Sequence, residues 1–205
     1  MAKLLLTSNG FFTDTIKKGF LELIEGDIGR LRAAIITTAS PKKESNRYAQ
    51  KARMDFAEMG FRQVDFVDIE FQNPGVLERM DVVYINGGNP FQLLHYARKS
   101  GADAILTALA ERNAVLVGVS AGSLLLGPHI RIVSRFTPEM NTPQLTDLSA
   151  LHLTDHLIFP HYDREDLFPD SGGRSIEERI AEFESSEQCV VTRLPDDGYI
   201  AISGE

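Results

Sequence analysis

The sequence predicts an α/β fold, with a doubly wound, mostly parallel sheet covered by helices on both faces, in a single domain over residues 1–205. Two observations lead to this prediction. Short, continuous apolar segments alternate with longer amphipathic ones over residues 3–119, and such segments are typical of parallel strands buried on both faces. The chain has 205 residues, of which 43% are hydrophobic, enough for one sizeable core. Right-handed crossovers between parallel strands then give the doubly wound arrangement.

Five buried strands are expected, at residues 3–7, 32–37, 64–69, 82–86 and 115–119. Helices are expected between them, at residues 13–24, 44–59, 91–99 and 102–112, the first from apolar residues at helical spacing such as Ile16, Phe20 and Leu23. After Gly127, prolines interrupt the pattern, so one helix is clear, at 175–183, and residues 137–147 are expected to form a loop. The apolar runs 189–192 and 199–202 are expected to pair antiparallel at the edge of the sheet.

Charge and cysteine content restrict the partners and the compartment. The formal net charge of −8 argues against non-specific binding to nucleic acid or to an anionic membrane, because both require a positive face. Its one cysteine, Cys189, allows no intrachain disulfide, and no targeting segment or membrane span is evident, so we expect a cytoplasmic protein. No spacing of residues implies a metal or a cofactor. A homodimer is compatible with this composition.

The strongest local signal is Gly118-Val119-Ser120-Ala121-Gly122, where an apolar strand ends in a serine and an apolar segment follows at once. In this spacing, a tight strand-to-helix turn exposes the serine hydroxyl at the top of the sheet, with helix N-terminal amides nearby to stabilise an oxyanion. Ser120 is therefore the candidate nucleophile, and Ser123, inside the predicted helix, is the weaker candidate. The alternative is a glycine-rich turn that binds a phosphate or has no ligand.

A second glycine-rich turn, Asn86-Gly87-Gly88-Asn89-Pro90, also follows a predicted strand. Ligands of doubly wound sheets bind at the carboxyl ends of the strands, so the two turns are candidates for one site. The glycines allow the backbone to approach a substrate closely and offer a second oxyanion amide. The alternative is an ordinary turn in which Asn89 caps the next helix and Pro90 takes its first position.

A serine nucleophile needs a base and a group that orients the base. Of the five histidines, His161 follows the apolar run 157–160, so it can lie on the rim where Ser120 emerges. A hydrogen-bonded loop histidine is the alternative. The orienting acid stays open at this point, because spacing does not choose among four candidates: Asp163, Asp196, Asp197 and Glu139.

Taken in order, several short motifs resemble the peptidase E family, the aspartyl dipeptidases. They are the two glycine-rich turns, Gly127-Pro128, Pro160-His161, Glu177-Glu178-Arg179-Ile180 and Leu194-Pro195-Asp196, spread over the chain from Lys3 to Ile202. The resemblance implies a flavodoxin-like fold similar to that of class I glutamine amidotransferases, with a serine in place of their cysteine. It also implies a serine-type peptidase that hydrolyses short peptides, among them dipeptides with N-terminal aspartate, through an acyl-enzyme.

The resemblance further implies which residues form the site. They are Ser120 as nucleophile, His161 as base, Asp196 (or Asp197) as orienting acid, and the amides of Gly88 and Ala121 as oxyanion hole. Two departures from the family concern the substrate. Residues 130–135 include no acid where the family has one, and Ile176 stands where aspartyl dipeptidases have an arginine. Arg174, two residues earlier, is the candidate partner for a substrate carboxylate, which a guanidinium can bind in bidentate fashion.

Two other functions stay open on the same fold. A cyanophycinase-like hydrolase of β-aspartyl-arginine peptides would share the elbow but need an acidic pocket, for which the net charge of −8 is limited support. A non-catalytic binding protein with an inert Ser120 would fit Ile176 and the missing acid. Glutamine amidotransferase activity is disfavoured, because the elbow carries serine and Cys189 lies elsewhere in the sequence.

Overall fold

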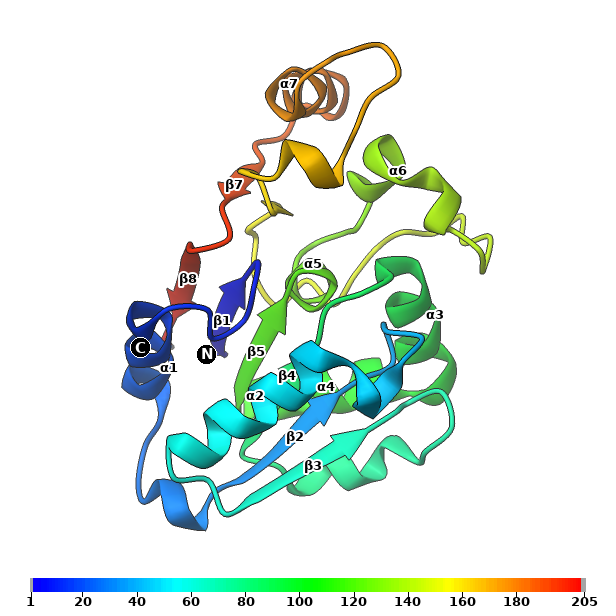
Figure 1. The fold of residues 1–205 in the computed structure, drawn as a ribbon. Coiled ribbons are helices and arrows are strands. Elements are labelled where there is room, and N and C mark those ends of the chain that lie inside the picture. Colours follow the sequence, from blue (N-terminus) through cyan, green and yellow to red (C-terminus); the bar gives the residue numbers. More distant parts are fainter. Residues whose placement is uncertain (1, 204–205) are drawn as a thin grey trace.

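A six-stranded sheet forms the centre of the computed structural model, which describes residues 2–203 (Figure 1). The strand order is β3-β2-β4-β5-β1-β8, with five parallel strands and β8 antiparallel to β1 at one edge. The strands are β1 (Lys3–Thr7), β2 (Arg32–Ile36), β3 (Gln63–Val67), β4 (Val82–Ile85), β5 (Val115–Val119) and β8 (Tyr199–Ile202). The predicted mostly parallel α/β sheet is confirmed, and the five parallel strands lie where the sequence predicts them, with ends shifted by at most two residues.

Helices cover both faces of the sheet. They are α1 (Asp14–Leu23), α2 (Arg47–Glu58), α3 (Pro90–Ser100), α4 (Ala102–Glu111), α5 (Ala121–Leu126), α6 (Val133–Phe136) and α7 (Ile176–Glu187), with 3-10 turns at Ile28–Arg30, Lys43–Ser45, Pro74–Arg79, Pro138–Met140 and Glu165–Leu167. Side chains of α1 and α2 pack on one face, and those of α3, α4 and α5 on the other, as the doubly wound prediction requires. Within residues 2–203, no helix is both long and apolar enough to cross a membrane.

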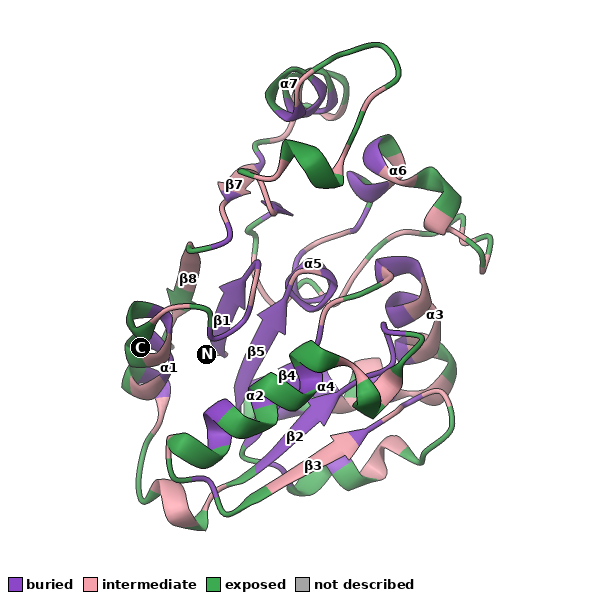
Figure 2. Cartoon of the chain, in the orientation of Figure 1, coloured by how far each residue is buried: buried purple, intermediate pink, exposed green. Residues whose placement is uncertain are grey.

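Four strands supply much of the core: β1, β2, β4 and β5 are the buried, purple centre of the molecule in Figure 2, whereas β3 and β8 at the edges are partly exposed. On the face of α1 and α2, an aromatic cluster has ring centroids 5.0 to 6.1 Å apart; its members are Phe11, Phe20, Phe56, Phe61 and Tyr84. Tilted and edge-on ring pairs contribute about 0.5–1.5 kcal/mol each beyond the burial of their area. The cluster therefore holds α1 and α2 firmly against the sheet.

Polar caps decide where the helices begin. The side chain of Asn46 accepts a hydrogen bond from the Tyr48 N–H, so α2 starts at Arg47 and not at Glu44 as the periodicity suggests. Residues 43–45 instead form a separate 3-10 turn. Asn89 caps α3 in the same way, as the sequence predicts, and a capping box opens α7.

One pairing expected at the sheet edge is wrong. The last run forms β8, which pairs antiparallel with β1. Of the run 189–192 only Thr192 lies in a strand, β7 (Thr192–Leu194), which pairs in parallel with β6 (Ile158–Pro160) in a separate two-stranded sheet. Burial does not choose between these pairings, because Leu194 of β7 and Ile200 and Ile202 of β8 all pack in the core on the α3–α5 face. The pairing is set by free strand edges: β8 pairs with the edge of β1 that β5 leaves free, and β7 pairs with β6. Figure 1 shows β7 and α7 beyond the carboxyl ends of β1 and β5.

A buried serine ties α5 to β1. The Ser123 side chain is fully buried, and its hydroxyl accepts a hydrogen bond from the Thr7 N–H at 3.0 Å and donates one to the Thr7 carbonyl at 2.8 Å. The same carbonyl accepts a hydrogen bond from the Ser120 N–H at 2.9 Å. Ser123 therefore has a structural role, since its hydroxyl is engaged with the backbone and shielded from any substrate.

We expect Ser123→Ala to lower the free energy of unfolding by about 1–3 kcal/mol, because the buried Thr7 N–H would lose its acceptor. Urea unfolding followed by circular dichroism measures this loss. The exposed Ser185, on α7, provides the control, and Ser185→Ala should stay within about 0.5 kcal/mol of the wild type. Equal stability of Ser123→Ala and wild type would contradict the structural role.

Candidate active site

Ser120 occupies a strained turn between β5 and α5. Its backbone has φ 49° and ψ −108°, a conformation that costs a non-glycine residue on the order of 1–3 kcal/mol. The two flanking glycines are required by close packing, because a Cβ at Gly118 would lie 2.6 Å from the Ser123 Cα and one at Gly122 would lie 2.1 Å from the Ile85 carbonyl oxygen. The motif therefore folds as the strand-turn-helix elbow that the sequence predicts, with Ser120 at the carboxyl edge of the sheet.

A pocket of about 510 Å³ opens beside Ser120. Its walls come from six parts of the chain: the loop after β1, α2 with its N-cap, the end of β4 with the turn after it, the elbow, the segment after β6 and the segment after β7. Among the lining residues are Ser8, Phe11, Phe12, Tyr48, Tyr84, Asn86, Gly87, Gly88, Ser120, His161, Arg164 and Asp196. The two glycine-rich turns and the histidine expected on the rim therefore share one pocket.

His161 and Asp196 are in direct contact in this pocket. The Nδ1 atom of His161 lies 2.5 Å from the Oδ1 atom of Asp196, and the two side chains are only 19% and 10% exposed. The His161 backbone, at φ 59°, is fixed by its N–H, which donates to the Ser8 hydroxyl at 3.0 Å; that hydroxyl donates to the Leu194 carbonyl at 2.8 Å. An imidazole held in this way through Nδ1 can use Nε2 to exchange a proton with a nucleophile.

The structure distinguishes the four candidate acids by position. Asp196 is the one that contacts the imidazole, while Asp163 accepts a hydrogen bond from the Asp196 N–H at 2.8 Å and so fixes its backbone. Asp197 and Glu139 are exposed, and neither lines the pocket. Which acid contacts His161 depends on the geometry of the turn after β7, and no local sequence pattern specifies that geometry.

The turn after β4 lies against the elbow. A Cβ at Gly87 would be 3.2 Å from the Ser120 Cβ, and a Cβ at Gly88, where φ is 143°, would be 2.2 Å from the Ala39 carbonyl oxygen. Only glycine fits this second position. The turn and the first residue of α5, Ala121, therefore bring two backbone segments to Ser120, as the expected pair of oxyanion amides requires.

Three cations on the pocket wall were not identified from the sequence. Arg47 and Lys51 lie four residues apart on α2, and Arg164 follows His161 by three residues. The sequence signal that could have identified Arg47 and Lys51 is the position of α2. This helix follows β2 through residues 37–46 and so begins near the carboxyl edge of the sheet, where the site lies. Arg164 donates to Asp196 Oδ2 at 3.1 Å and to both carboxylate oxygens of Asp166, which raise the pKa of the guanidinium, so it stays charged.

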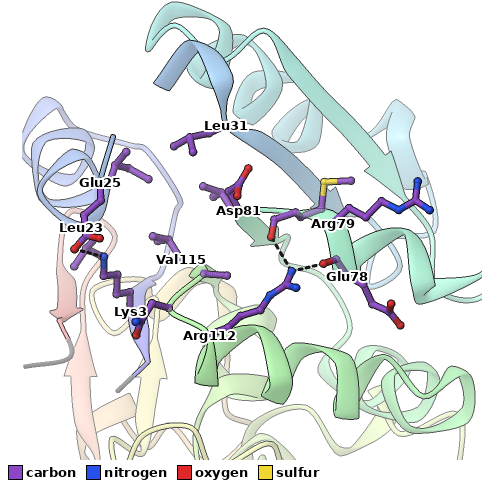
Figure 3. A pocket seen from close by; sticks show the side chains of 14 residues that line it. Lys3, Leu23, Glu25, Leu31, Glu78, Arg79, Asp81, Arg112 and Val115 are labelled. Atoms are coloured by element: carbon purple, nitrogen blue, oxygen red, sulfur yellow. Dashed lines mark hydrogen bonds and ion pairs between the residues drawn. The ribbon is translucent and has the colours of Figure 1, made fainter. Parts of the chain in front are cut away.

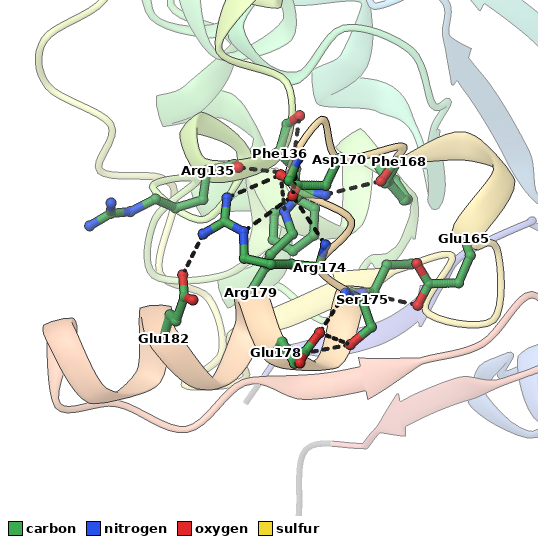
Figure 4. A network of polar contacts seen from close by, with 12 residues as sticks. Arg135, Phe136, Glu165, Phe168, Asp170, Arg174, Ser175, Glu178, Arg179 and Glu182 are labelled. Carbon is green, nitrogen blue, oxygen red and sulfur yellow. Dashed lines mark hydrogen bonds and ion pairs between the residues drawn. The ribbon is translucent and has the colours of Figure 1, made fainter.

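Arg174, the expected partner of a substrate carboxylate, lies elsewhere. Its guanidinium binds Asp170 at 3.0 Å and Glu182 at 2.8 Å, in the network drawn in Figure 4, and it does not line the pocket of Ser120. Ile176 is 1% exposed and packs in the core, so the start of α7 presents no side chain at that position to the site. The loop before α7 is therefore stabilised internally by Arg174, and the cations at the pocket come from other elements.

A second hollow lies at the opposite, amino-terminal edge of the sheet, among Lys3, Glu25, Asp81 and Arg112 (Figure 3). Several of its charged groups are engaged within the chain: Lys3 binds Glu25 at 2.7 Å, Asp81 accepts from the Arg32 N–H, and Arg112 donates to backbone carbonyls. Over residues 2–203, no group of three or more His, Cys, Asp or Glu side chains is arranged to hold a metal ion. The chemically equipped pocket is thus the one at Ser120.

Comparison with known proteins places this site in a family. An uncharacterized peptidase of Pasteurella multocida is 30% identical over 166 residues, 79% of this chain and 78% of its own length. An uncharacterized peptidase of Listeria innocua is 28% identical over 80% of this chain and 78% of its own length. Peptidase E of Shigella flexneri is 29% identical over 85% of this chain and 74% of its own length.

Solved structures show the same fold. A Listeria monocytogenes protein assigned to peptidase E superposes over 100% of this chain and 96% of its own, with a TM-score of 0.78 and 24% identity. A peptidase from an acI-B1 actinobacterium superposes over 83% of this chain and 73% of its own, with a TM-score of 0.62 and 17% identity. The profile of peptidase family S51 matches residues 4–205. The chain is therefore a peptidase and belongs to peptidase family S51.

Proposed function

We propose that the chain is a serine-type peptidase that hydrolyses short peptides through an acyl-enzyme on Ser120. The observation that carries this proposal is the contact of His161 with Asp196, at 2.5 Å, in the pocket that also contains the strained Ser120. A serine hydroxyl is a weak nucleophile until a base takes its proton, and an oriented imidazole supplies that base. A pocket of about 510 Å³ suits a short peptide.

The reaction follows from these positions. His161 Nε2 takes the proton of the Ser120 hydroxyl as the oxygen attacks the scissile carbonyl, and Asp196 stabilises the imidazolium that results. The N–H groups of Gly88 and Ala121 receive the negative oxygen of the tetrahedral intermediate. His161 then donates the proton to the leaving amine as the C–N bond breaks, which leaves an ester on Ser120. Water attacks this ester by the same steps and releases the acid.

The substrate class that we propose is peptides with an N-terminal aspartate. Three cations line the pocket, Arg47, Lys51 and Arg164, against two carboxylates, Asp55 and Asp196. Both carboxylates are already paired: Asp55 binds Lys17 and Lys51 at 2.8 and 2.6 Å, and Asp196 binds His161 and Arg164. Of the three cations, Lys51 and Arg164 are held by these carboxylates, and Arg164 also by Asp166, so Arg47 is the lining cation that no carboxylate among residues 2–203 binds. An anionic substrate group can therefore pair with Arg47, whereas the arginine of a β-aspartyl-arginine unit would meet no free acid on this wall.

We expect Ser120→Ala to reduce kcat/KM for an Asp-Leu dipeptide by about 10⁴-fold or more, with no loss of fold, because the nucleophile is removed. His161→Ala should lose a comparable factor, since the serine hydroxyl would lack its base. Release of leucine from a panel of Xaa-Leu dipeptides, with Asp, Glu, Asn, Ala and Arg as Xaa, measures both. Turnover that survives Ser120→Ala would refute the mechanism, and Ser120-dependent turnover of Arg-Leu alone would refute the substrate class.

Arg174→Ala should leave KM for Asp-Leu unchanged, because the guanidinium lies outside the pocket, and should instead destabilise the fold. Hydrogen bonds from Arg174 lower the pKa of Asp170 from 3.8 to about 2. A lowered carboxyl pKa contributes stability above the unfolded value, and that contribution is lost as the pH falls through the folded value. The stability difference from wild type, measured by thermal unfolding, should therefore be present at pH 7 and shrink between about pH 4 and pH 2.

A rise in KM for Asp-Leu that Ala-Leu does not share would return Arg174 to the role of substrate anchor. Arg98→Ala is the matched control for the removal of an arginine that binds an aspartate. Arg98 binds Asp147 at 3.0 Å and does not line the pocket of Ser120. The substitution should change neither KM. Because Arg98 also donates to the carbonyls of Asp147 and Ser149, at 2.9 and 2.7 Å, it serves as a control for KM and not for stability.

A further inference from the structure

Asn86 is a buried polar residue that lines the pocket of Ser120 and that neither the mechanism nor the fold uses. It directly follows β4, and its N–H donates to the Ile36 carbonyl at 3.0 Å, so the backbone continues the strand by one residue. Alternation along the strand places its side chain on the same face as Tyr84, toward α1 and α2. The residue is 2% exposed and lines the pocket.

The side-chain amide of Asn86 lacks a partner in the protein. Its Nδ2 atom is buried, and no residue among 2–203 accepts a hydrogen bond from it. Asn89, three residues later, shows the opposite case: its amide donates to the Met140 carbonyl at 2.8 Å, and its Oδ1 atom accepts from the N–H groups of Phe91 and Gln92. A buried donor without an acceptor destabilises the folded chain, so each such group in a native protein calls for an explanation. For Asn86, unlike His129 and Arg179 with their unpaired ring and guanidinium nitrogens, the group lies on the wall of the pocket of Ser120.

We propose that Asn86 binds the substrate, through a hydrogen bond from its amide to an oxygen on the side chain of the N-terminal residue. This inference rests on the proposed function. It assigns to the site a donor that recognises a carboxylate or a carboxamide and disfavours a side chain without an acceptor oxygen. A site built to form a hydrogen bond rejects an analogue that lacks the partner atom, because its own polar group is then left unpaired.

The depth of the pocket indicates which part of the substrate reaches Asn86. The mouth is formed by half-exposed aromatics, Phe12 at 53% and Tyr48 at 48% exposure, whereas Asn86, Tyr84 and Asp55 at its base are 2%, 3% and 5% exposed. The next residue along the turn, Gly87, lies against Ser120. An acyl group attached to the Ser120 hydroxyl therefore has its carbonyl beside the glycines and its short side chain directed to the base, where the Asn86 amide is a buried donor that no residue among 2–203 uses.

The test compares Asn86→Leu, which keeps the side-chain shape and removes the amide, with Asn89→Leu as the matched control. The ratio of kcat/KM for Asp-Leu to that for Ala-Leu should fall by about 10- to 100-fold in Asn86→Leu, as for loss of one buried hydrogen bond to substrate. Its unfolding temperature should equal or exceed that of wild type, since an unpaired buried amide is removed. Asn89→Leu should lower the unfolding temperature, since it breaks three formed hydrogen bonds. If Asn86→Leu does not fold, Asn86→Ala replaces it in every measurement.

A fluorophosphonate probe for Ser120 separates this inference from the proposed function. Equal labelling of wild type and Asn86→Leu with an unchanged substrate ratio would overturn the role of Asn86 and leave the peptidase mechanism intact. Labelling of wild type but not of Asn86→Leu would also overturn it, because Asn86 would then act on the nucleophile itself. Absence of labelling in wild type would refute the mechanism, and calorimetric titration with free L-aspartate then decides the inference: binding that Asn86→Leu loses supports it, and no difference overturns it.

Discussion

The close packing of α5 against β4, β5 and β1 determines where the reacting groups can lie. Glycines at 118 and 122 let the helix approach the sheet to distances that no Cβ would allow, and Ser123 fastens it to both backbone groups of Thr7. The chain has to pass from β5 to α5 within one residue, and Ser120 takes the strained conformation of that residue. The hydrophobic cores on the two faces of the sheet hold β5 and α5 in place and so maintain the strained conformation of Ser120. Its hydroxyl therefore lies between two packed elements and not on a loop.

One side chain joins the other half of the site to the end of β1 by hydrogen bonds. Ser8, directly after β1, donates to the Leu194 carbonyl of β7 and accepts from the N–H of His161, which follows β6. The parallel pairing of β6 with β7 then brings His161 and Asp196, 35 residues apart in sequence, into hydrogen-bonding contact. The geometry of the proposed base and its carboxylate thus depends on the small second sheet, and that sheet depends on contacts with the end of β1.

Local patterns in the sequence were sufficient for the parallel sheet, its helices and the Ser120 elbow, because strand burial, caps and glycine spacing all act over a few residues. They also identified His161 from the apolar run before it. They could not pair β7 with β6 or β8 with β1, since each partner lies in a distant part of the chain and the choice depends on which strand edges the assembled sheet leaves free. Arg47, Lys51 and Asn86 were missed for the same reason: each lies on an ordinary-looking helix or strand end, and only the assembled pocket shows what they face.

The charge near Ser120 differs in sign from the net charge of the chain. The chain carries −8 overall, which by itself favours a cationic substrate, yet cations outnumber carboxylates on the wall beside Ser120. The two carboxylates of that wall are each held by cations or by the imidazole, so their charge is largely compensated where a substrate would meet it. Within a half-enclosed pocket the nearest groups dominate the potential, because charges on the exposed surface are screened by salt over about 8–10 Å. An acidic protein can therefore bind an acidic peptide, as we propose. The distribution of charged groups at the carboxyl edge of the sheet, and not the net charge of the chain, decides which substrate the pocket can hold.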